Sequence, residues 1–354
     1  ILHLPLYIFN LFLIITFCLT YHYYYRIYTF FLFYKLVAIL MKHNKNNIIT
    51  DTHNKIKNME IRGAGRIGRA SANALKEYSL TIQNINNSEF KEKMIKAGEV
   101  LKSARPTAVS LPNAINYVLS GLNSKNPKKN IILNAEEFIK SSSEATLKIG
   151  KIGANRIKDG WTILTHCNSE AAISIIKTAH NSGKNIKVIC TETRPRNQGY
   201  LTARTLADEG IDTTLIVDSA VRYHMKEVDI VVVGSDAITS NGCLVNKIGT
   251  SQIALMAYER KIPFITAAET YKFHSKTIIG ETVEIEERDI NEICEFEEKY
   301  KDKIKLRNPA FDITPSQYID GIITEIGIIP PQGAWHIIEK YFGNFKITCG
   351  SGKY

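Results

Sequence analysis

The sequence predicts an α/β protein in which an N-terminal helical bundle domain is followed by a domain built on a parallel sheet. From residue 41 to residue 157, apolar residues recur at the helical spacing of three and four, and strand-like runs are nearly absent. From residue 158 to residue 345, short β-branched runs alternate with helical segments. These strands are almost continuously apolar, as in a Rossmann-like domain whose sheet is covered by helices on both faces. Residues 346–354 form a tail.

Composition narrows the class of ligand. The 354 residues include 45 Lys and Arg against 35 Asp and Glu, which gives a formal net charge of +10. Nucleic-acid binders usually gather basic residues in runs with interleaved aromatics, whereas here they are spread out after residue 41. We therefore expect a small phosphorylated ligand and no nucleic acid. The six cysteines show no C-x-x-C pair and no metal-like spacing, which indicates a reducing compartment such as the cytoplasm, without a metal site.

Residues 1–40 differ from the rest, because they are nearly all Ile, Leu, Phe, Tyr and Thr. A stretch this long and apolar can span a bilayer. However, the chain begins with Ile, and its first Met is Met41, which a polar run follows at once. We expect residues 1–40 to be upstream sequence that is not part of the mature protein. A membrane anchor and a targeting peptide remain as alternatives; for the folded part we expect no membrane.

Helical spacing predicts the elements of the first domain. We expect helices over residues 51–75, 90–101, 112–119 and 135–157, and the first is interrupted at residues 63–65. Residues 131–133 are the one strand-like run.

A glycine-rich segment, Arg62-Gly63-Ala64-Gly65-Arg66-Ile67-Gly68, matches G-x-G-x-x-G. A dinucleotide site would need a preceding strand and an acidic residue about twenty positions later, and residues 55–59 do not form a good strand. We therefore expect no nicotinamide cofactor. A glycine-rich loop that opens a helix beside two arginines suits one phosphate. A flexible helix break with solvated arginines is the alternative.

Arg105 precedes Pro106 and Thr107, ahead of a predicted helix. Proline is favoured in the first turn of a helix, and a helix N-terminus attracts anions. Arg105 is thus either an anion ligand or an ordinary surface arginine.

The second domain alternates strands with helices. Predicted strands cover residues 162–165, 186–191, 214–217, 229–233, 263–267 and 318–324, and predicted helices cover residues 171–181, 200–209, 219–225, 250–259 and 333–341.

Cys167 lies on the turn between the first strand and the first helix of this domain. Asn168 or Ser169 can cap the helix, whose free N–H groups stabilise negative charge. A cysteine there can have a lowered thiolate pKa and act as a base or nucleophile. A small buried cysteine under a sheet is the alternative.

The other unusual polar residues lie next to the predicted strands and helices: most follow a strand, residues 246–250 lead into a helix, and residues 308–315 precede the last strand. They are Glu192 to Arg196, Asp218, Gly234 to Asp236, Asn246 to Thr250, Glu269 to Phe273 and Asn308 to Pro315. Each has an ordinary interpretation alone: Asp236 as a helix cap, Lys272 as a surface lysine, Asp312 in an Asx-turn. In open α/β sheets, ligands bind at the carboxyl ends of the strands, so together they indicate a site there.

Several of these motifs occur together in family order. They are RGAGR at 62–66, RPTAVSLP at 105–112, THCNS at 165–169, TETRP at 191–195, GSDAI at 234–238, NKIG at 246–249, AETYKF at 268–273 and NPAFDITP at 308–315. Between about residues 56 and 341 the chain closely resembles the archaeal ribose-1,5-bisphosphate isomerases. Their family also holds the 5-methylthioribose-1-phosphate isomerases and the regulatory subunits of initiation factor 2B.

The resemblance implies an aldose–ketose isomerase that makes ribulose 1,5-bisphosphate in archaeal AMP metabolism and so supplies RubisCO. This isomerisation is expected to require no metal or cofactor. The isomerases carry a Cys and an Asp that the initiation-factor subunits lack, and here these are Cys167 and Asp236. The resemblance assigns Cys167 as thiolate base and Asp236 as acid. We expect desolvation behind an apolar strand to keep Asp236 protonated despite nearby Arg and Lys.

The resemblance also implies two phosphate cradles between the domains. The helical domain would supply Arg62, Gly63, Ala64, Gly65, Arg66 and Arg105, and the α/β domain would supply Asn168, Ser169, Asn246, Lys247 and Lys272. Methylthioribose-phosphate isomerases tend to read Arg-Gly-Ala-Pro at the first loop, so Gly65 followed by Arg66 favours a bisphosphate.

One departure is Glu170, where relatives have Lys: either a phosphate contact is lost, or Glu170 faces away. The resemblance implies a homo-oligomer, expected to be a hexamer. The alternatives are a methylthioribose-phosphate isomerase and a non-catalytic regulatory protein related to initiation factor 2B.

Overall fold

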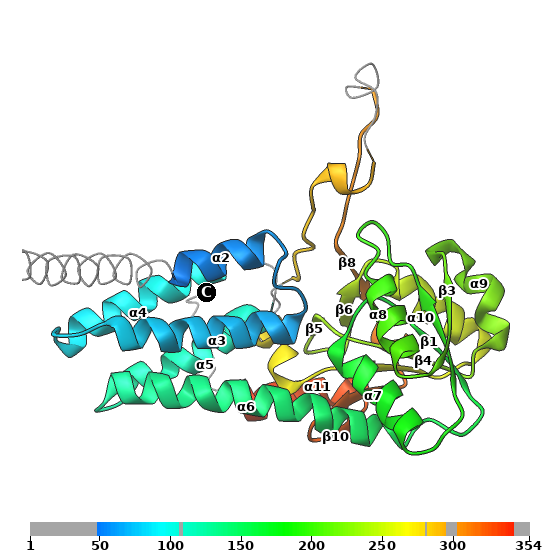
Figure 1. The fold of residues 1–354 in the computed structure, drawn as a ribbon, viewed down its shortest axis with the longest axis horizontal. Coiled ribbons are helices and arrows are strands. Elements are labelled where there is room, and N and C mark those ends of the chain that lie inside the picture. Colours follow the sequence, from blue (N-terminus) through cyan, green and yellow to red (C-terminus); the bar gives the residue numbers. More distant parts are fainter. Residues whose placement is uncertain (1–47, 106–108, 280–281, 295–302, 343–354) are drawn as a thin grey trace, which may run out of the picture.

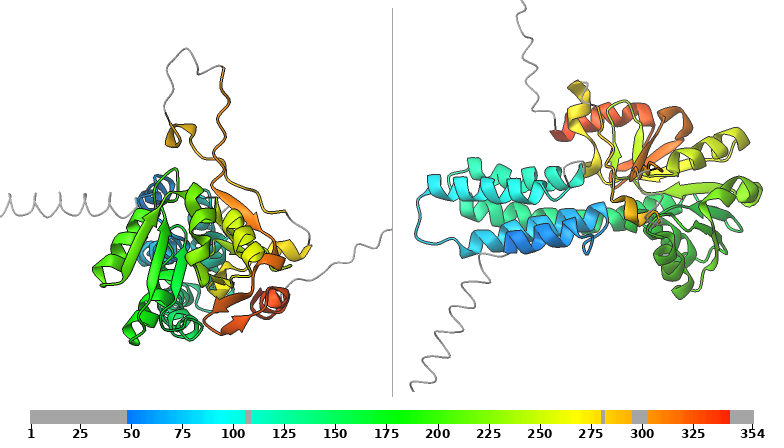
Figure 2. Two further views of the ribbon diagram at one scale, coloured as in Figure 1. Left: turned by 90° about the vertical axis from the view of Figure 1, so that its right-hand side faces the viewer. Right: turned by 90° about the horizontal axis from the view of Figure 1, so that it is seen from above.

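The computed structural model describes residues 48–105, 109–279, 282–294 and 303–342. The expectations for residues 1–40, for Pro106 and Thr107, and for the tail 346–354 lie outside these ranges. A bundle of helices extends from one side of an α/β part, as Figures 1 and 2 show. Among the helices that the structure describes, none combines the length and hydrophobicity that crossing a lipid bilayer requires.

The bundle confirms the helical prediction. Its helices are α2 (Ile48–Lys57), α3 (Ala64–Thr81), α4 (Asn87–Lys102), α5 (Ser110–Leu119) and α6 (Pro127–Ala154). The strand-like residues 131–133 lie within α6. Ile131 is fully buried on the apolar face of that helix, while Leu133 is half exposed. Helical periodicity over 28 residues thus outweighs three β-favouring residues.

Helix α6 belongs to both parts of the molecule. Its first half packs in the bundle core, with Ile131, Ala135 and Phe138. Its last turns place Ile149 and Ala154 in a second core, against the sheet. The expected boundary at residue 157 stays a prediction, since the bundle and the sheet share this helix.

The central sheet has the order β10-β9-β7-β4-β1-β2-β3. All neighbours are parallel except the edge pair β9 and β10. The strands are β1 (Thr162–Thr165), β2 (Lys187–Thr191), β3 (Asp212–Ile216), β4 (Ile230–Val233), β7 (Phe264–Ala267), β9 (Gly321–Thr324) and β10 (Gly327–Ile329). The six predicted strands are confirmed within a few residues, and β10 was not predicted.

Helices cover the sheet on both faces, which explains its continuously apolar strands. They are α7 (Glu170–Asn181), α8 (Gly199–Asp208), α9 (Val221–His224), α10 (Thr250–Arg260) and α11 (Ala334–Phe342). Leu164 and Val231 face a core with α10 and α11. Ile163 and Val232 face the opposite core, with α7. The predicted helix 219–225 is broken, because 3-10 turns flank the four-residue α9.

A second sheet was not predicted. It is antiparallel and consists of β5 (Ala237–Ile238), β6 (Leu244–Lys247) and β8 (Phe311–Thr314). Its register pairs Asn246 with Asp312 and Lys247 with Phe311. Asn246 and Lys247 are thus the last two residues of an unpredicted strand, and the segment that they begin leads into α10 as expected. Such short strands with polar residues give little periodic signal.

A two-stranded ribbon projects from the body beside this sheet (Figure 1). In the described part of the chain it consists of residues 282–294 and 303–310. Its two sides are held together by Arg288 N–H, which donates to the Asn308 carbonyl at 2.9 Å, and by Ala310 N–H, which donates to the Glu286 carbonyl at 2.8 Å. The base of the ribbon borders the site described next.

Candidate active site

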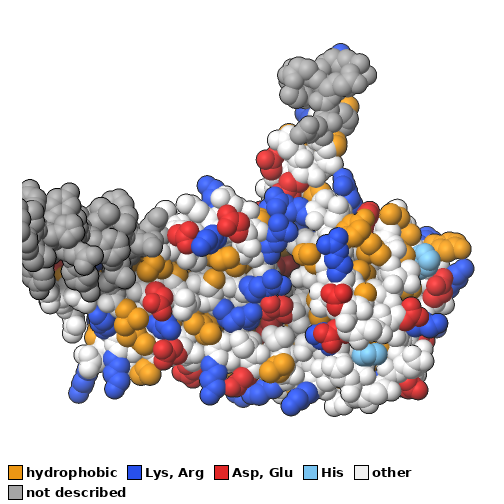
Figure 3. Space-filling view, viewed as in Figure 1, with side chains coloured by type: hydrophobic (Ala, Val, Ile, Leu, Met, Phe, Trp, Pro, Cys, Tyr) orange, Lys and Arg blue, Asp and Glu red, His pale blue; other side chains and the backbone are white. Residues whose placement is uncertain are grey.

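A polar pocket lies where the bundle meets the carboxyl edge of the sheet. Figure 3 shows Lys and Arg side chains on both sides of the hollow between these parts. The lining includes Gly63, Ala64, Gly65, Arg66, Arg105, Cys167, Asn168, Ser169, Asp236, Asn246, Lys247 and Lys272. The structure therefore brings together twelve of the thirteen predicted site residues from six separate segments of the chain.

Arg62 is the predicted site residue that does not line the pocket. Its Nε donates a 2.5 Å hydrogen bond to the carbonyl of Met59, which holds the side chain against the end of the preceding turn. The contact of Arg62 with substrate stays a prediction.

The glycine-rich loop joins two helices, α2 and α3, with no strand before it. Gly63 takes the N-cap position of α3 with a φ of 85°, a conformation that suits glycine. Gly63, Ala64 and Gly65 line the pocket, so the first turn of α3 borders it. Free N–H groups at a helix N-terminus bind phosphate, and this agrees with an anion-binding loop.

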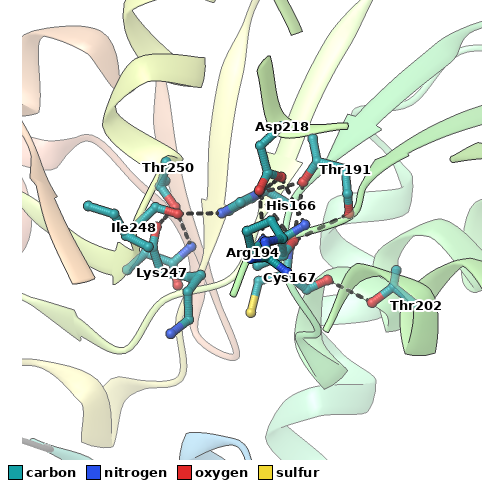
Figure 4. A network of polar contacts seen from close by, with 12 residues as sticks. His166, Cys167, Thr191, Arg194, Thr202, Asp218, Lys247, Ile248 and Thr250 are labelled. Carbon is teal, nitrogen blue, oxygen red and sulfur yellow. Dashed lines mark hydrogen bonds and ion pairs between the residues drawn. The ribbon is translucent and has the colours of Figure 1, made fainter. Parts of the chain in front are cut away.

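Cys167 lies on the tight turn after β1, with a φ of 68°. Its N–H donates to Thr193 Oγ1 at 2.9 Å, and its carbonyl accepts from Thr202 Oγ1 at 2.7 Å (Figure 4). Ser169 caps α7 by accepting from the N–H of Ala172 at 3.3 Å. The Asn168 amide instead donates to Thr202 at 3.0 Å.

The expectation of a lowered pKa at Cys167 is wrong for the free protein. Burial raises the pKa of the Cys167 thiol to about 11, and the charges of Asp236 and Asp218 add to this. The charge of Lys247 and a backbone hydrogen bond from Asn168 lower the pKa, but desolvation is the largest effect. The cysteine is therefore a thiol at neutral pH until something removes its proton.

Two lysines enter the pocket from the α/β part. Lys247 is 8% exposed, and its Nζ lies 5.0 Å from the centroid of the Phe311 ring. Lys272 forms a 2.7 Å ion pair with Glu269, and both side chains are almost completely buried. The interpretation of Lys272 as a surface lysine is wrong, because the residue is only 4% exposed.

Hydrogen bonds hold two acidic residues, Asp236 and Asp312, in place near the second sheet. Asp236 follows β4, and its N–H donates to the Val245 carbonyl at 3.0 Å, which fixes its backbone beside β6. Asp312 accepts from the N–H groups of Gly249 and Ser251, so it holds the start of α10. Burial raises the pKa of Asp312 to about 6, against the opposing effect of these hydrogen bonds.

On the bundle side, Arg66 and Arg105 face the pocket with acidic partners. Arg66 Nε lies 2.7 Å from Glu170, which also lines the pocket. Of the two alternatives for Glu170, the outward orientation is therefore wrong. Arg105 is 8% exposed and pairs with Glu286 of the ribbon at 3.0 Å.

Arg288 is a pocket residue that sequence reasoning missed. It lies on the ribbon, with Nη1 3.5 Å from Glu286 and Nε 3.2 Å from Glu292. The alternation of apolar and acidic residues from Val283 to Glu286 indicates a short strand-like run, and Arg288 is the one basic residue among the acidic ones that follow. His166, Gln198 and Glu269 also line the pocket and were not predicted as site residues.

Within the described ranges, no group of three or more His, Cys, Asp or Glu residues is arranged to hold a metal ion. The chemistry that the described residues offer is proton transfer by a thiol and a carboxyl group, with cations on two sides.

Residues 60–331 match the model of the initiation factor 2 subunit family. The chain belongs to this family. Among its relatives, the ribose 1,5-bisphosphate isomerase of Methanocaldococcus jannaschii is 71% identical over 305 residues, covering 86% of this chain and 99% of the relative. The ribose 1,5-bisphosphate isomerase of Archaeoglobus fulgidus is 54% identical over 297 residues, covering 83% and 94%. A crystal structure of translation initiation factor eIF-2B from Pyrococcus horikoshii shares the fold of this family member, with a TM-score of 0.71 and 33% identity over 80% of this chain and 97% of that chain.

Proposed function

We propose that this protein isomerises ribose 1,5-bisphosphate to ribulose 1,5-bisphosphate. The observation that carries the proposal is the 71% identity to an enzyme of that name across nearly its whole length. The pocket is consistent with it, because a thiol and a carboxyl group lie among cations from both parts of the molecule.

The chemical difficulty is that the phosphate on O1 prevents spontaneous ring opening. An acid must protonate the ring oxygen as its bond to C1 breaks, and a base must remove the proton from C2. A proton must then reach C1 while the C2 hydroxyl gives up its proton and becomes the ketone. Cys167 as base and Asp236 as acid would divide these steps. Proton transfer by a positioned side chain typically contributes about 10²–10⁴-fold to a rate.

The raised pKa of Cys167 adds a step to this scheme. Its thiol must first lose a proton, and Asp236, whose charge acts on the sulfur, is the acceptor that we propose. This scheme begins with an ionised Asp236 and replaces the protonated Asp236 that we expected from the sequence. One transfer from sulfur to carboxylate creates the thiolate base and the carboxylic acid together, and no proton is gained from or lost to solvent. Lys247 favours the thiolate, because its charge lowers the pKa of the sulfur.

The two phosphates would bind on opposite sides of this pair. One cradle is the first turn of α3 with Arg66 and Arg105, and the other is formed by Ser169, Lys247 and Lys272. A substrate with a single phosphate would leave one set of cations without its anion. Sites built for a charged group discriminate strongly against a ligand that lacks it, so the geometry favours the bisphosphate over methylthioribose 1-phosphate. A purely regulatory role would make no use of the Cys167 and Asp236 pair.

We propose a cytoplasmic homo-oligomer, a hexamer by resemblance, that acts in AMP metabolism. Exposed apolar side chains at the end of β3 and on α9 and α10 support an association surface. Among them are Leu215, Val217, Tyr223 and Tyr258. Light scattering on the purified protein tests the assembly, and a monomer would contradict it.

The activity is tested by incubating the purified protein with ribose 1,5-bisphosphate and separating the sugar bisphosphates. We expect ribulose 1,5-bisphosphate to accumulate. With 5-methylthioribose 1-phosphate we expect kcat/KM to be lower by about 10²-fold or more, because one phosphate contact set is lost. Absence of ribulose 1,5-bisphosphate would contradict the proposed function, and preference for the monophosphate would reassign the substrate.

A further inference from the structure

His166, the residue before Cys167, has no part in the proton transfers above, yet it is 2% exposed at the pocket wall. Its ring joins two segments that the sequence separates widely (Figure 4). Nδ1 lies 2.6 Å from Thr191 Oγ1 at the end of β2, and Nε2 lies 2.9 Å from the carbonyl of Ile248.

These partners determine which ring nitrogen carries hydrogen. The Ile248 carbonyl can only accept, so Nε2 must donate to it. Burial lowers the pKa of His166 to about 4, although the charge of Asp218 and the bond to Ile248 oppose this, and Lys247 adds to the lowering. The ring is thus neutral near pH 7, and Nδ1 accepts from the Thr191 hydroxyl.

The contacts continue from Thr191 to the catalytic turn. Thr193 Oγ1 lies 3.2 Å from Thr191 Oγ1 and accepts the N–H of Cys167 at 2.9 Å. A connected set of hydrogen bonds therefore runs from Cys167 through both threonines to His166, and from His166 to the Ile248 carbonyl. The Thr193 hydroxyl can also donate to the Thr191 carbonyl at 3.3 Å or to Nδ1 at 3.4 Å, so each of its acceptors belongs to the same buried network.

The backbone conformations of Cys167 and Thr193, which share a hydrogen bond, need this support. Cys167 has a φ of 68° and Thr193 a φ of 62°, which are left-handed values that non-glycine residues rarely adopt. Each such conformation is energetically unfavourable and persists only where the surroundings hold it. On the other side of the ring, Ile248 directly follows the cradle residues Asn246 and Lys247.

We infer that His166 is a positioning residue that couples the Cys167 turn to the Lys247 strand end. The inference rests on the proposed function for its kinetic consequences. Its Nδ1 side holds the thiol in place for proton transfer, and its Nε2 side holds a phosphate-binding lysine. Loss of the first contact is then expected to lower kcat, and loss of the second to raise KM.

Two substitutions separate the two sides. His166→Gln places an amide donor near the position of Nε2 but removes the Nδ1 acceptor, whereas His166→Asn keeps an acceptor near Nδ1 and cannot reach Ile248. We expect His166→Gln to lower kcat by about tenfold or more with little change in KM, since small misplacements of reacting groups are costly. We expect His166→Asn to change mainly KM.

Thr191 provides a control that leaves the imidazole in place. Thr191→Val removes the hydroxyl that donates to Nδ1 and should reproduce the loss of kcat in His166→Gln. Thr191→Ser retains the hydroxyl and should restore most of the activity. Equal activity in the two Thr191 variants would overturn the inference, as would a shift of the same kinetic parameter by both His166 variants.

A second readout does not depend on the substrate. Peptide-resolved iodoacetamide labelling compares Cys167 with Cys294, which is exposed on the ribbon. His166→Gln and Thr191→Val should speed labelling of Cys167 by at least about threefold, because a released turn exposes the sulfur. Labelling of Cys294 should not change. If the wild-type protein shows no turnover while this difference appears, the proposed function fails and the coupling stands; unchanged labelling of Cys167 overturns the coupling.

Discussion

Glu170 Oε2 lies 2.8 Å from Nη2 of Arg69, and this contact ties the helix after Cys167 to the helix after the glycine-rich loop. The other carboxylate oxygen lies 2.7 Å from Arg66. Gly65 leaves room for this arrangement, since a Cβ there would lie 3.0 Å from Tyr271 Oη and 3.2 Å from Arg69 Nη1. A carboxylate thus lies at the edge of the proposed phosphate cradle, where it pairs with the cradle residue Arg66 and with Arg69 one turn further along α3.

Glu170→Gln is expected to tighten substrate binding. The substitution removes the negative charge that competes with a phosphate for Arg66. We expect KM for the bisphosphate to fall by about fivefold, which corresponds to a partly exposed ion pair of about 1 kcal/mol. Glu136→Gln is the matched control, because Glu136 pairs with Lys76 on the bundle surface and should leave KM unchanged. An unchanged or higher KM in Glu170→Gln would show that the carboxylate does not compete.

The same residue predicts a pH dependence of stability. Burial opposes ionisation of Glu170, but the hydrogen bond from Arg69 and the charges of Arg69 and Arg66 outweigh it and lower its pKa below the ordinary 4.5. Because the folded-state pKa is lowered, the stabilisation is present above pH 4.5 and disappears as pH falls through the folded-state value. Urea unfolding should show a gap between wild type and Glu170→Gln at pH 7 that closes in acid. A gap that widens in acid would contradict the assignment.

Lys272 and Glu269 test how a buried ion pair serves both stability and binding. Lys272→Met leaves Glu269 buried without a counter-charge, which typically costs about 3–5 kcal/mol of unfolding free energy. The double variant Lys272→Met/Glu269→Gln should recover most of that stability. Both variants should raise KM for the bisphosphate, because the cation is missing in each. If the double variant regains normal KM, Lys272 has no part in phosphate binding.

Asp312 is expected to make the protein less stable as pH rises from about 4 to about 6. Its pKa is raised from 3.8 to about 6 by burial, so the folded state holds the proton more tightly than the unfolded chain. The stabilisation is complete below the unfolded value and is lost as pH passes the folded value, by about 3 kcal/mol for two pKa units. Asp312→Asn should abolish this fall in unfolding experiments across that pH range. A fall of equal size in the variant would assign the effect to other groups.

Sequence reasoning located the site because the polar residues follow strands. Cys167 follows β1 and Asp236 follows β4, and parallel order brings these strand ends to one edge. The strands of the central sheet other than β10 were predicted within a few residues, because continuous apolar runs leave few alternatives. The short sheet that carries Asn246 and Lys247 escaped notice, because its pairing depends on the distant Asp312 and Phe311.

Three features of the site could not be read from the sequence. The pKa of Cys167 depends on how far the sulfur is desolvated, and only the packed structure shows that burial outweighs the helix N-terminus. Arg288 reaches the pocket from the ribbon, whose short alternating run does not indicate which part of the molecule it meets. The ion pairs of Glu170 cross 101 positions to Arg69, a separation over which sequence gives no contact information.

The measurement that tests the central proposal most directly is the kcat of Cys167→Ser and Asp236→Asn with ribose 1,5-bisphosphate. A serine hydroxyl ionises far less readily than a thiol, and an asparagine carries no proton that it can donate, so each kcat should fall by about 10²-fold or more. KM should stay within a few-fold, since the cradles are untouched. Cys243→Ser, away from the pocket lining, should keep full activity. Full kcat in Cys167→Ser would contradict the account.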